Sequence, residues 1–292
     1  MNNKTAAVVT LYNPVLEKTL DLIQKLHSQC DYVILVDNTP KEKLGVFDYS
    51  SNPDNVIYYA LCANMGIAYA QNYGFMKAIR LGCEFFLTFD QDSTIEVDYV
   101  SQLLSDYFSA KKNVEKIAAI GPLIINERNN KKFDREISMG KEIIPGVFSV
   151  ESIISSGALI TLDALTYVGL NKAEWFIDLI DIEWSYRARY LGWSILSTTN
   201  IVLKHNLGQN DIILPGGRSF AKCTPFRLYY VYRNWLFSNR EPSFPLKYKI
   251  KKLFIMPCKF MIYMFSDEGV SRVKFMLKGI WDGLLGNTGP YR

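Results

Sequence analysis

Two carboxylates lie two residues apart in the triplet Asp90-Gln91-Asp92, directly after the apolar run at residues 84–89. Carboxylate oxygens bind hard divalent cations, and Mg²⁺ in proteins is commonly shared with the phosphates of a substrate. A solvated turn or a helix cap would use the same residue types. The triplet is therefore a candidate metal and phosphate site whose function depends on the residues that lie beside it.

The segment 175–184 (WFIDLIDIEW) holds a second acidic group, made of Asp178, Asp181 and Glu183. Its large apolar residues predict partial burial, which raises the pKa of a carboxylic acid and suits it to act as a general base. The structural alternative is that these acids cap a helix and interact with its dipole. Arg187, four residues after Glu183, predicts a salt bridge on the same helix.

Other polar residues also stand at the ends of apolar runs or before helical ones. Asp37 and Asn38 end one such run, and they either hydrogen-bond a base or ribose or form a turn. Asn64 and Gly66, with Asn72 further on, indicate a helix start that allows close approach of the backbone. The sequence contains neither GxGxxG nor GxxxxGK followed by Ser or Thr, so it supports neither a Rossmann dinucleotide site nor a P-loop.

Two further candidates lie in the second half of the chain. His205 follows the strand-like segment 194–204 and is either a structural residue or a ligand. Arg233 and Asn234 follow a tyrosine-rich stretch, and they either bind an anionic or sugar ligand or pack on the surface.

The elements that must position these residues alternate in the amino-terminal part of the chain. Apolar runs predict strands at 5–12, 31–36, 55–60 and 84–89, and helical spacing predicts helices at 15–29 and 66–81, the first with Leu16, Leu20, Ile23 and Leu26 on one face. Continuous apolar strands that alternate with helices predict a parallel sheet covered on both faces. Ligands bind such sheets at the carboxyl ends of the strands, where residues 10–13, 37–38 and 90–92 fall and where Asn64 adds from the same side.

The second half of the chain is less regular. Residues 117–125 and 194–204 predict strands, with a Gly-Pro interruption in the first, and 126–143 predict a loop or edge structure. Helices are predicted from Leu162, over 181–191 and from residue 225 onwards. Pro215-Gly216-Gly217 predicts that residues 208–222 form a mobile loop.

Composition bounds the class of protein. The chain has 292 residues, of which 49% are apolar and 21% charged, values typical of a globular protein. Five cysteines without a CxxC pair exclude a disulfide framework and a Cys-rich zinc site and favour a reducing compartment, and two histidines exclude a multi-histidine metal centre. The sequence has no apolar run of about 18 residues, so it predicts no transmembrane helix. Residues Met1 to Lys4 show no signal-peptide pattern.

Charge is concentrated at the carboxyl-terminal end. Residues 240–292 carry a net charge of +6, whereas the rest of the chain carries −2. Helical spacing groups Lys247, Lys251 and Lys252, and it places a set of apolar residues on another face: Leu246, Ile250, Leu253, Phe254 and Met261. Pro257 is expected to kink this helix. The pattern predicts a helix that lies on an anionic membrane surface, and the alternative is a packed helix with solvated lysines.

Taken in order, the motifs between Val8 and Asn234 resemble the family 2 glycosyltransferases with the GT-A fold. They are TLYNP at 10–14, Asp37-Asn38, Asn64-x-Gly66 with Ala70 and Asn72, Asp90-Gln91-Asp92, FIDLIDIEWSYRARYLGW at 176–193, and His205 followed by Gly208. The DIEWxxRAR segment and the later YRN look most like the rhamnosyltransferase branch. Enzymes of that branch use dTDP-L-rhamnose to build bacterial surface polysaccharide.

The resemblance implies a donor site built from several of these positions. The backbone of Thr10, Leu11 and Tyr12, together with Asp37, would hold the nucleotide base. Asn64 and Gly66 would approach the nucleotide and its phosphates. The remaining residues that the resemblance places in the nucleotide-sugar site are Asn38, Asn72, Asp90, Gln91 and Arg233.

The resemblance also implies a metal and a base. Asp92 would bind Mg²⁺ or Mn²⁺ directly, Asp90 would contact ribose or the metal, and His205 would lie near the diphosphate or the metal. Asp181 would be the catalytic base, because it matches the aspartate of the family's Glu-Asp pair. Ile180 stands here in place of the glutamate, which leaves Asp178 as the alternative base.

The implied fold is α/β of the GT-A type: a Rossmann-like mixed sheet, mostly parallel and flanked by helices, with a C-terminal helical extension. Residues 1–239 would form the catalytic domain and 240–292 the basic amphipathic tail. One carboxylate and one metal suffice for single displacement with inversion, because the metal neutralises the leaving diphosphate while the base acts on the opposite face of the sugar.

The implied activity is transfer of a deoxysugar, L-rhamnose from dTDP-β-L-rhamnose, to a hydroxyl of a lipid-linked glycan in O-antigen or related polysaccharide biosynthesis. The expected location is cytoplasmic and peripheral on the inner face of the cell membrane, with no nucleic-acid partner and with a homodimer through the C-terminal helices as a further option. The alternatives are a UDP-sugar donor and a non-catalytic homologue that binds sugar nucleotides or glycans.

Overall fold

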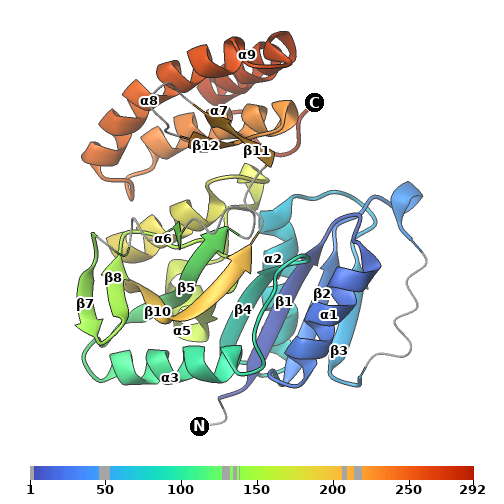
Figure 1. Cartoon of the computed structure of the whole chain (residues 1–292), viewed down its shortest axis with the longest axis vertical. Coiled ribbons are helices and arrows are strands. Elements are labelled where there is room, and N and C mark those ends of the chain that lie inside the picture. The colour runs from blue at the N-terminus through green and yellow to red at the C-terminus, as the bar shows by residue number, and fades with distance from the viewer. Residues whose placement is uncertain are drawn as a thin grey trace.

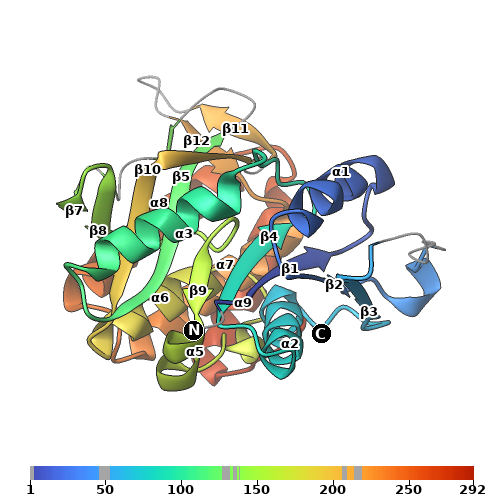
Figure 2. The same cartoon turned by 90° about the horizontal axis from the view of Figure 1, so that it is seen from below.

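The computed structural model describes residues 3–45, 53–126, 132–133, 137, 139–205, 209–213 and 219–292. A central sheet lies between two layers of helices, and a further layer of helices crosses one end of it (Figure 1). The same arrangement seen from below shows the helices on either side of the sheet (Figure 2).

The amino-terminal half of the sheet is parallel, as predicted. Its strands are β1 (Thr5–Leu11), β2 (Tyr32–Asp37), β3 (Val56–Ala60) and β4 (Phe85–Asp90), and their spatial order is β3-β2-β1-β4. Thr10 pairs with Val36 on one side and with Asp90 on the other. The three strands therefore end at the same level, and the polar residues that follow them collect at one edge.

The second half of the sheet is mixed. In the described part of the chain, the sheet continues as β9-β5-β10-β8-β7 and has ten strands in all, including β6 beside β5. The bounds are β5 (Ile117–Asn126), β6 (Lys132–Phe133), β7 (Lys141–Ile144), β8 (Val147–Val150), β9 (Leu159–Thr161) and β10 (Ser194–His205). The short strand β9 runs antiparallel to both β4 and β5, whereas β10 is parallel to β5. The sequence did not indicate the direction of β9, because three residues carry no pattern that distinguishes the two directions.

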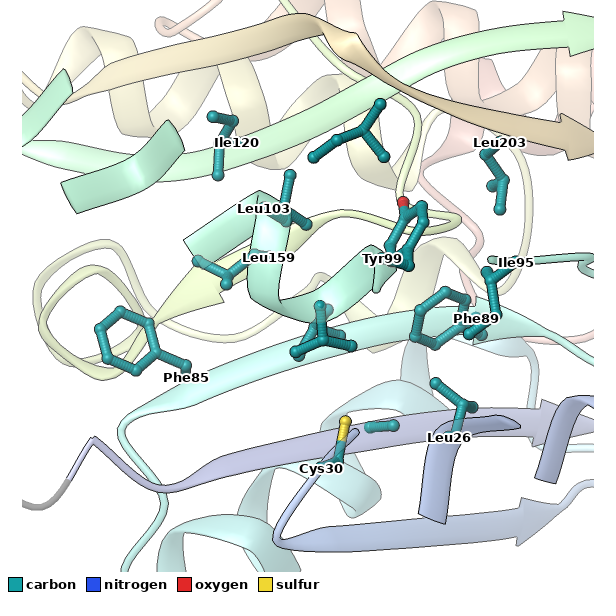
Figure 3. Close-up of a cluster of buried hydrophobic side chains, with 14 of the residues drawn as sticks. Leu26, Cys30, Phe85, Phe89, Ile95, Tyr99, Leu103, Ile120, Leu159 and Leu203 are labelled. Atoms are coloured by element: carbon teal, nitrogen blue, oxygen red, sulfur yellow. The ribbon is translucent and has the colours of Figure 1, made fainter. Parts of the chain in front are cut away.

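Helices cover both faces of the sheet (Figure 2). α1 (Leu16–His27) and α3 (Tyr99–Lys111) lie on one face, and α2 (Ile67–Arg80), α5 (Leu162–Val168) and α6 (Ile180–Tyr190) lie on the other. Short 3-10 turns are η1 (Lys41–Lys43) and η2 (Ala173–Trp175). Figure 3 shows the core beneath α3, where Tyr99 lies beside Phe89 of β4 and Leu103 lies near Leu159 of β9. Strands whose residues are buried on both faces explain the continuous apolar runs of the sequence.

The buried face of α1 differs from the predicted one. The helix buries Thr19, Leu22, Ile23 and Leu26, while Leu16 is 50% and Leu20 42% exposed. A polar residue is accommodated on the buried face because the Thr19 hydroxyl donates to the main-chain oxygen of Val15 at 3.0 Å. Ile23 and Leu26 were predicted correctly, but the apolar face is rotated toward Leu22.

Three helices form the layer that crosses the carboxyl ends of the parallel strands (Figure 1): α7 (Pro225–Arg240), α8 (Leu246–Met264) and α9 (Gly269–Leu285). α7 and α9 are in close contact, since a side-chain carbon added at Gly279 would come within 2.3 Å of the Tyr229 main-chain oxygen. α8 continues through Pro257 as one helix. Because α7 packs on α9, the helical layer begins before residue 240.

The segment predicted as a mobile loop at 208–222 contains two paired strands. β11 (Gln209–Ile213) and β12 (Ser219–Lys222) run antiparallel, and residues 208 and 214–218 lie outside the described residues. An antiparallel strand pair therefore occupies the described ends of the segment that was predicted as a loop. Among the described residues, no helix combines the length and the apolar character needed to cross a membrane.

Candidate active site

The acidic triplet lies at the end of β4, beside the end of β1. The Gln91 side chain accepts a hydrogen bond from the Tyr12 main-chain nitrogen at 2.7 Å and donates one to the Tyr12 oxygen at 3.2 Å. This pair holds the ends of the two strands together. Asp92 follows, partly exposed, and its carboxylate has no hydrogen bond or ion pair with another described residue. Asp92 is therefore available to a ligand at this edge.

Asp37, at the end of β2, is fully buried. Its carboxylate accepts hydrogen bonds from the Thr39 main-chain nitrogen and from the Tyr58 hydroxyl, each at 2.9 Å. The structure therefore places Asp37 at the expected edge, but its carboxylate holds the loop after β2 in shape.

Asn38 and Asn64 meet, as their predicted positions imply. Asn38 donates to the Asn64 side-chain oxygen at 3.2 Å and accepts from the Met65 main-chain nitrogen at 2.8 Å. Asn64 also accepts from the Gly66 nitrogen at 3.1 Å. The two amides join the loop after β2 to the start of α2 and shape the edge between them.

Gly66 begins α2 with φ of 86°, a conformation that favours glycine. A side-chain carbon at this position would lie 2.5 Å from the Phe176 main-chain oxygen. The close approach expected at Gly66 is thus an approach to the segment that precedes Asp181.

The hydroxyl of Thr10 is buried without a hydrogen-bond partner among the described residues. Thr10 sits directly beside Asp90 in the sheet. A buried hydroxyl without a partner is uncommon in folded proteins and is typical of a position that a ligand or water completes.

Asp181 lies in the first turn of α6. Its carboxylate accepts hydrogen bonds from the Ile182 main-chain nitrogen at 2.9 Å and from the Ser155 nitrogen at 3.3 Å. Burial raises the pKa of Asp181 to about 6; the two hydrogen bonds oppose that rise, and the charge of Asp178 adds to it. A carboxylate with this pKa is ionised at neutral pH and is a stronger base than an exposed one.

Ser155, Ser156 and Gly157 connect Asp181 to the end of β4. The Thr88 hydroxyl donates to the Ser155 oxygen, the Ser93 and Ser156 hydroxyls are 3.0 Å apart, and the Gly157 nitrogen donates to the Thr88 oxygen at 2.6 Å. From the sequence, residues 152–161 are recognisable only as a stretch of small and apolar residues. Its signal was the Ser-Ser-Gly run, whose small side chains allow such close contacts.

The backbone immediately before Asp181 is strained. Phe176, Asp178 and Leu179 have φ of 66°, 68° and 64°, values that cost about 1–3 kcal/mol each for residues other than glycine. Asn234 on α7 holds this segment by donating to the main-chain oxygens of Ile177 at 2.7 Å and Asp178 at 2.9 Å. Such strain is concentrated at functional sites, and here it lies directly before α6.

Arg233, predicted for the nucleotide-sugar site, is bonded to the backbone in the structure. Its side chain is fully buried and donates to the main-chain oxygens of Gly289 at 2.6 Å and Trp175 at 2.9 Å. Asn72, also predicted for that site, makes similar contacts. Its amide exchanges hydrogen bonds with the main chain of Asn171, at 2.8 and 2.9 Å. Both side chains use their polar atoms to join distant parts of the backbone.

Arg227 was missed by the sequence analysis. Its guanidinium, on α7, lies 2.5 Å from one oxygen of Asp178 and 3.3 Å from the other. The Asp178 carboxylate raises the pKa of Arg227, and the charge of Asp90 contributes to the same rise. Asp178 is thus engaged in an ion pair, whereas no ion pair involves Asp181 in the described part of the chain.

Two other predictions can be located. The salt bridge on α6 is confirmed, with Arg187 Nε 2.9 Å from Glu183 Oε1. His205 ends β10, but its side chain lies outside the described residues, as does Gly208. Within the described residues, no group of three or more metal-ligand side chains occurs.

No family model matches the chain. The chain is 28% identical to the dTDP-rhamnosyl transferase RfbF of Shigella flexneri over 307 residues, which cover 100% of this chain and 99% of that protein. Two structures illustrate the fold: GalNAc-T7 with UDP, GalNAc and Mn²⁺, and S. aureus TarS 1–349 in complex with UDP-GlcNAc.

The structural matches are distant in sequence. GalNAc-T7 has a TM-score of 0.56 at 14% identity, over 85% of this chain and 54% of that one, so this chain spans about half its length. The TarS fragment has a TM-score of 0.56 at 16% identity, over 97% of this chain and 81% of that one. The fold is that of the GT-A glycosyltransferases, as predicted, and its C-terminal helical region is present.

The chain thus has the GT-A fold and is similar over its whole length to a dTDP-rhamnosyl transferase. This similarity agrees with the predicted resemblance to the rhamnosyltransferase branch of family 2.

Proposed function

We propose that the chain is an inverting rhamnosyltransferase, which moves L-rhamnose from dTDP-β-L-rhamnose to a hydroxyl of a lipid-linked glycan in bacterial surface polysaccharide synthesis. Full-length similarity to a dTDP-rhamnosyl transferase supports the choice of donor. The observation that carries the reaction is Asp181, a carboxylate with a raised pKa that is bonded through Ser155 to the segment beside Asp90.

The edge formed by the ends of β1, β2 and β4 is the proposed donor site. The backbone at Thr10 to Tyr12 and the loops joined by Asn38 and Asn64 would border the nucleotide. Buried Thr10 Oγ1, which has no partner among the described residues, supports a ligand here. The predicted contact of His205 with the diphosphate or the metal stays part of this proposal.

Asp92, with Asp90, would hold Mg²⁺ or Mn²⁺. The fit rests on the chemistry of the donor set, because two carboxylates suit a hard cation that takes its remaining ligands from water and substrate phosphates. GalNAc-T7 is described with Mn²⁺, which is consistent with this choice. A bound ion would neutralise charge on the departing diphosphate.

In this proposal Asp181 takes the proton of the acceptor hydroxyl. The acceptor oxygen then forms its bond to the anomeric carbon while the bond from that carbon to the diphosphate breaks, with the electron pair leaving on dTDP. Attack from the face opposite the leaving group inverts the configuration. A double displacement would need a second, free carboxylate, and the ion pair with Arg227 argues against Asp178 in that role.

We also propose that the tail lies on the anionic inner face of the cell membrane. Tyr263 is the one buried residue of α8, and the exposed fraction is 72% for Leu246, 70% for Phe254 and 79% for Phe265. Exposed Lys247 lies on the same helix. This arrangement suits an interfacial helix better than a packed one. A homodimer through these helices is the competing proposal.

The test of the function is hydrolysis of dTDP-rhamnose without an acceptor. We expect slow, Mn²⁺- or Mg²⁺-dependent release of dTDP. A thermal-shift screen of dTDP-, UDP- and GDP-sugars identifies the donor, and a preference for UDP-sugars would favour the alternative that the TarS and GalNAc-T7 structures represent. Donor binding without any turnover would indicate a non-catalytic homologue.

A further inference from the structure

A cavity of about 280 Å³ opens beside Asp181, between the start of α6 and the C-terminal helices. Its walls include two acids before and within α6 and the aromatic side chains of α7 and α8. The lining residues include Asp181, Tyr232, Trp235, Lys252, Lys259 and Tyr263. The base proposed for transfer is thus exposed to this cavity.

Two lysines of α8 lie around one ring in the cavity wall. The ammonium groups of Lys252 and Lys259 lie 5.0 and 5.3 Å from the centre of the Trp235 ring. Both residues are half-buried, and no ion pair involves Lys252 in the described part of the chain. Burial lowers the pKa of Lys252 to about 8, and the neighbouring Lys259 and Lys251 charges lower it further. An aromatic face attracts cations but carries no net charge, so the Trp235 ring does not neutralise the positive charge of Lys252.

An apolar groove of about 320 Å³ adjoins this cavity. It is lined by Tyr232, Leu253, Met256, Pro257, Phe260, Met261 and Ile280 and presents no polar surface. Tyr232 borders both spaces, and its hydroxyl donates to the Met256 main-chain oxygen at 3.0 Å. The Asp181 carboxylate of α6 and the two lysines of α8 therefore line one space, and the apolar groove of the C-terminal helices adjoins it.

We propose that this cavity and groove bind the acceptor as an alkyl-chain phosphate or diphosphate, with its phosphate between Lys252 and Lys259 and its chain along the groove. The glycan attached to the phosphate then reaches Asp181 from the same cavity. The inference rests on the proposed function and names the parts of the acceptor that the chain recognises. Ammonium groups that are partly withdrawn from water bind phosphate oxygens well, because the charged hydrogen bonds replace hydration already lost.

The test measures binding of geranylgeranyl diphosphate, below its micellar concentration and without vesicles, by titration calorimetry. We expect the full-length protein to bind it more tightly than geranylgeraniol or inorganic pyrophosphate. Replacing both lysines (Lys252→Gln with Lys259→Gln) should weaken binding by about tenfold or more, since two charged hydrogen bonds are lost. The matched control is Lys112→Gln with Lys274→Gln, which removes the same charge from exposed positions outside the cavity and should leave the affinity unchanged.

A substitution in the groove distinguishes recognition of the alkyl chain from recognition of the phosphate. Leu253 is 64% exposed, so Leu253→Gln should not impair folding. It should weaken the binding of geranylgeranyl diphosphate and leave the binding of pyrophosphate unchanged. Equal loss in both lysine pairs, or binding to anionic vesicles without binding to the soluble probe, would overturn the inference in favour of a diffuse surface charge. Donor hydrolysis by the wild-type protein is measured separately. Hydrolysis without probe binding contradicts the acceptor site alone, whereas probe binding without hydrolysis contradicts the proposed reaction.

Discussion

The main-chain nitrogen of Ser155 donates to the carboxylate of Asp181 across 3.3 Å. The main-chain oxygen of Ser155 accepts a hydrogen bond from the hydroxyl of Thr88. Thr88 lies on β4, two residues before Asp90. The position of the proposed base relative to the proposed metal site therefore depends on a short chain of contacts. Those contacts join segments that lie far apart in the sequence.

Asp181→Asn should lower kcat by on the order of 10²-fold or more, because the amide cannot accept the proton of the acceptor hydroxyl. Donor affinity should hardly change. Steady-state transfer assays measure both quantities. Asp178→Asn is the control, because it removes the partner of Arg227 and leaves the carboxylate of Asp181. A larger loss of kcat for Asp178→Asn would assign the role of base to Asp178.

The pH dependence of kcat should also report the ionisation of Asp181. The pKa of Asp181 is raised from 3.8 to about 6, so wild-type kcat should rise with pH through about 6. The effect on stability has the opposite sign. Because the folded state holds this proton more tightly than the unfolded state, the free energy of unfolding should fall as pH rises from about 4 to 6. Asp181→Asn should lack this fall, as measured by urea unfolding at each pH.

Asp92→Asn should abolish transfer and weaken dTDP-rhamnose binding in the presence of Mn²⁺, since a carboxamide is a much poorer ligand for a hard cation. Calorimetry with and without Mn²⁺ measures the effect, and EDTA should reproduce it in the wild type. Glu96→Gln, an exposed acid a few residues on, is the matched control. Full activity of Asp92→Asn, or of wild type in EDTA, would remove the metal from the mechanism.

Gly66→Ala and Gly82→Ala should separate backbone strain from contact. Both glycines have positive φ, 86° and 78°, and an added carbon meets Phe176 at Gly66 but nothing within 4 Å at Gly82. Gly82→Ala should cost about 1 kcal/mol in the free energy of unfolding. Gly66→Ala should cost about 1–3 kcal/mol more, because the segment before Asp181 must move. Similar costs in urea unfolding would mean that the contact with Phe176 is readily relieved.

Asn234→Ala leaves main-chain oxygens of the strained segment without donors. It should lower the free energy of unfolding by about 1–3 kcal/mol. It should also reduce kcat while the donor KM stays near its wild-type value, because the segment precedes Asp181. Ser238→Ala is the control on the same helix, since the Ser238 hydroxyl donates to the main-chain oxygen of Trp235 one turn before it. Loss of stability with an unchanged kcat would limit Asn234 to a role in folding.

Lys247→Gln with Lys251→Gln should release the protein from anionic vesicles at physiological salt. Each lysine near an anionic surface contributes about 1 kcal/mol, so the pair should weaken binding roughly 30-fold. Raising the salt should act in the same direction. Lys18→Gln with Lys112→Gln, exposed lysines of the catalytic part, is the matched pair. Wild-type protein that ignores anionic vesicles at low salt would favour a homodimer interface at this surface.

Local patterns account for what was predicted at the level of elements. Four apolar runs between Thr5 and Asp90 gave the parallel half of the sheet, because buried parallel strands require continuous apolar sequence. The same pattern placed the acidic triplet and Asn38 at one edge, and spacing alone predicted the Arg187–Glu183 pair. These features depend on neighbours within a few residues, so one sequence is enough to find them.

The roles of Arg233 and Asn72 were decided by tertiary structure, because a polar side chain serves a ligand or the backbone according to which carbonyl oxygens the fold brings near it. The same holds for Arg227 and Ser155, whose partners Asp178 and Asp181 are 49 and 26 residues away. The direction of β9 and the placing of α7–α9 over the strand ends likewise depend on contacts between distant segments. The sequence alone determines which residues are able to do the chemistry, and only the packing of those segments decides which of them face a common space.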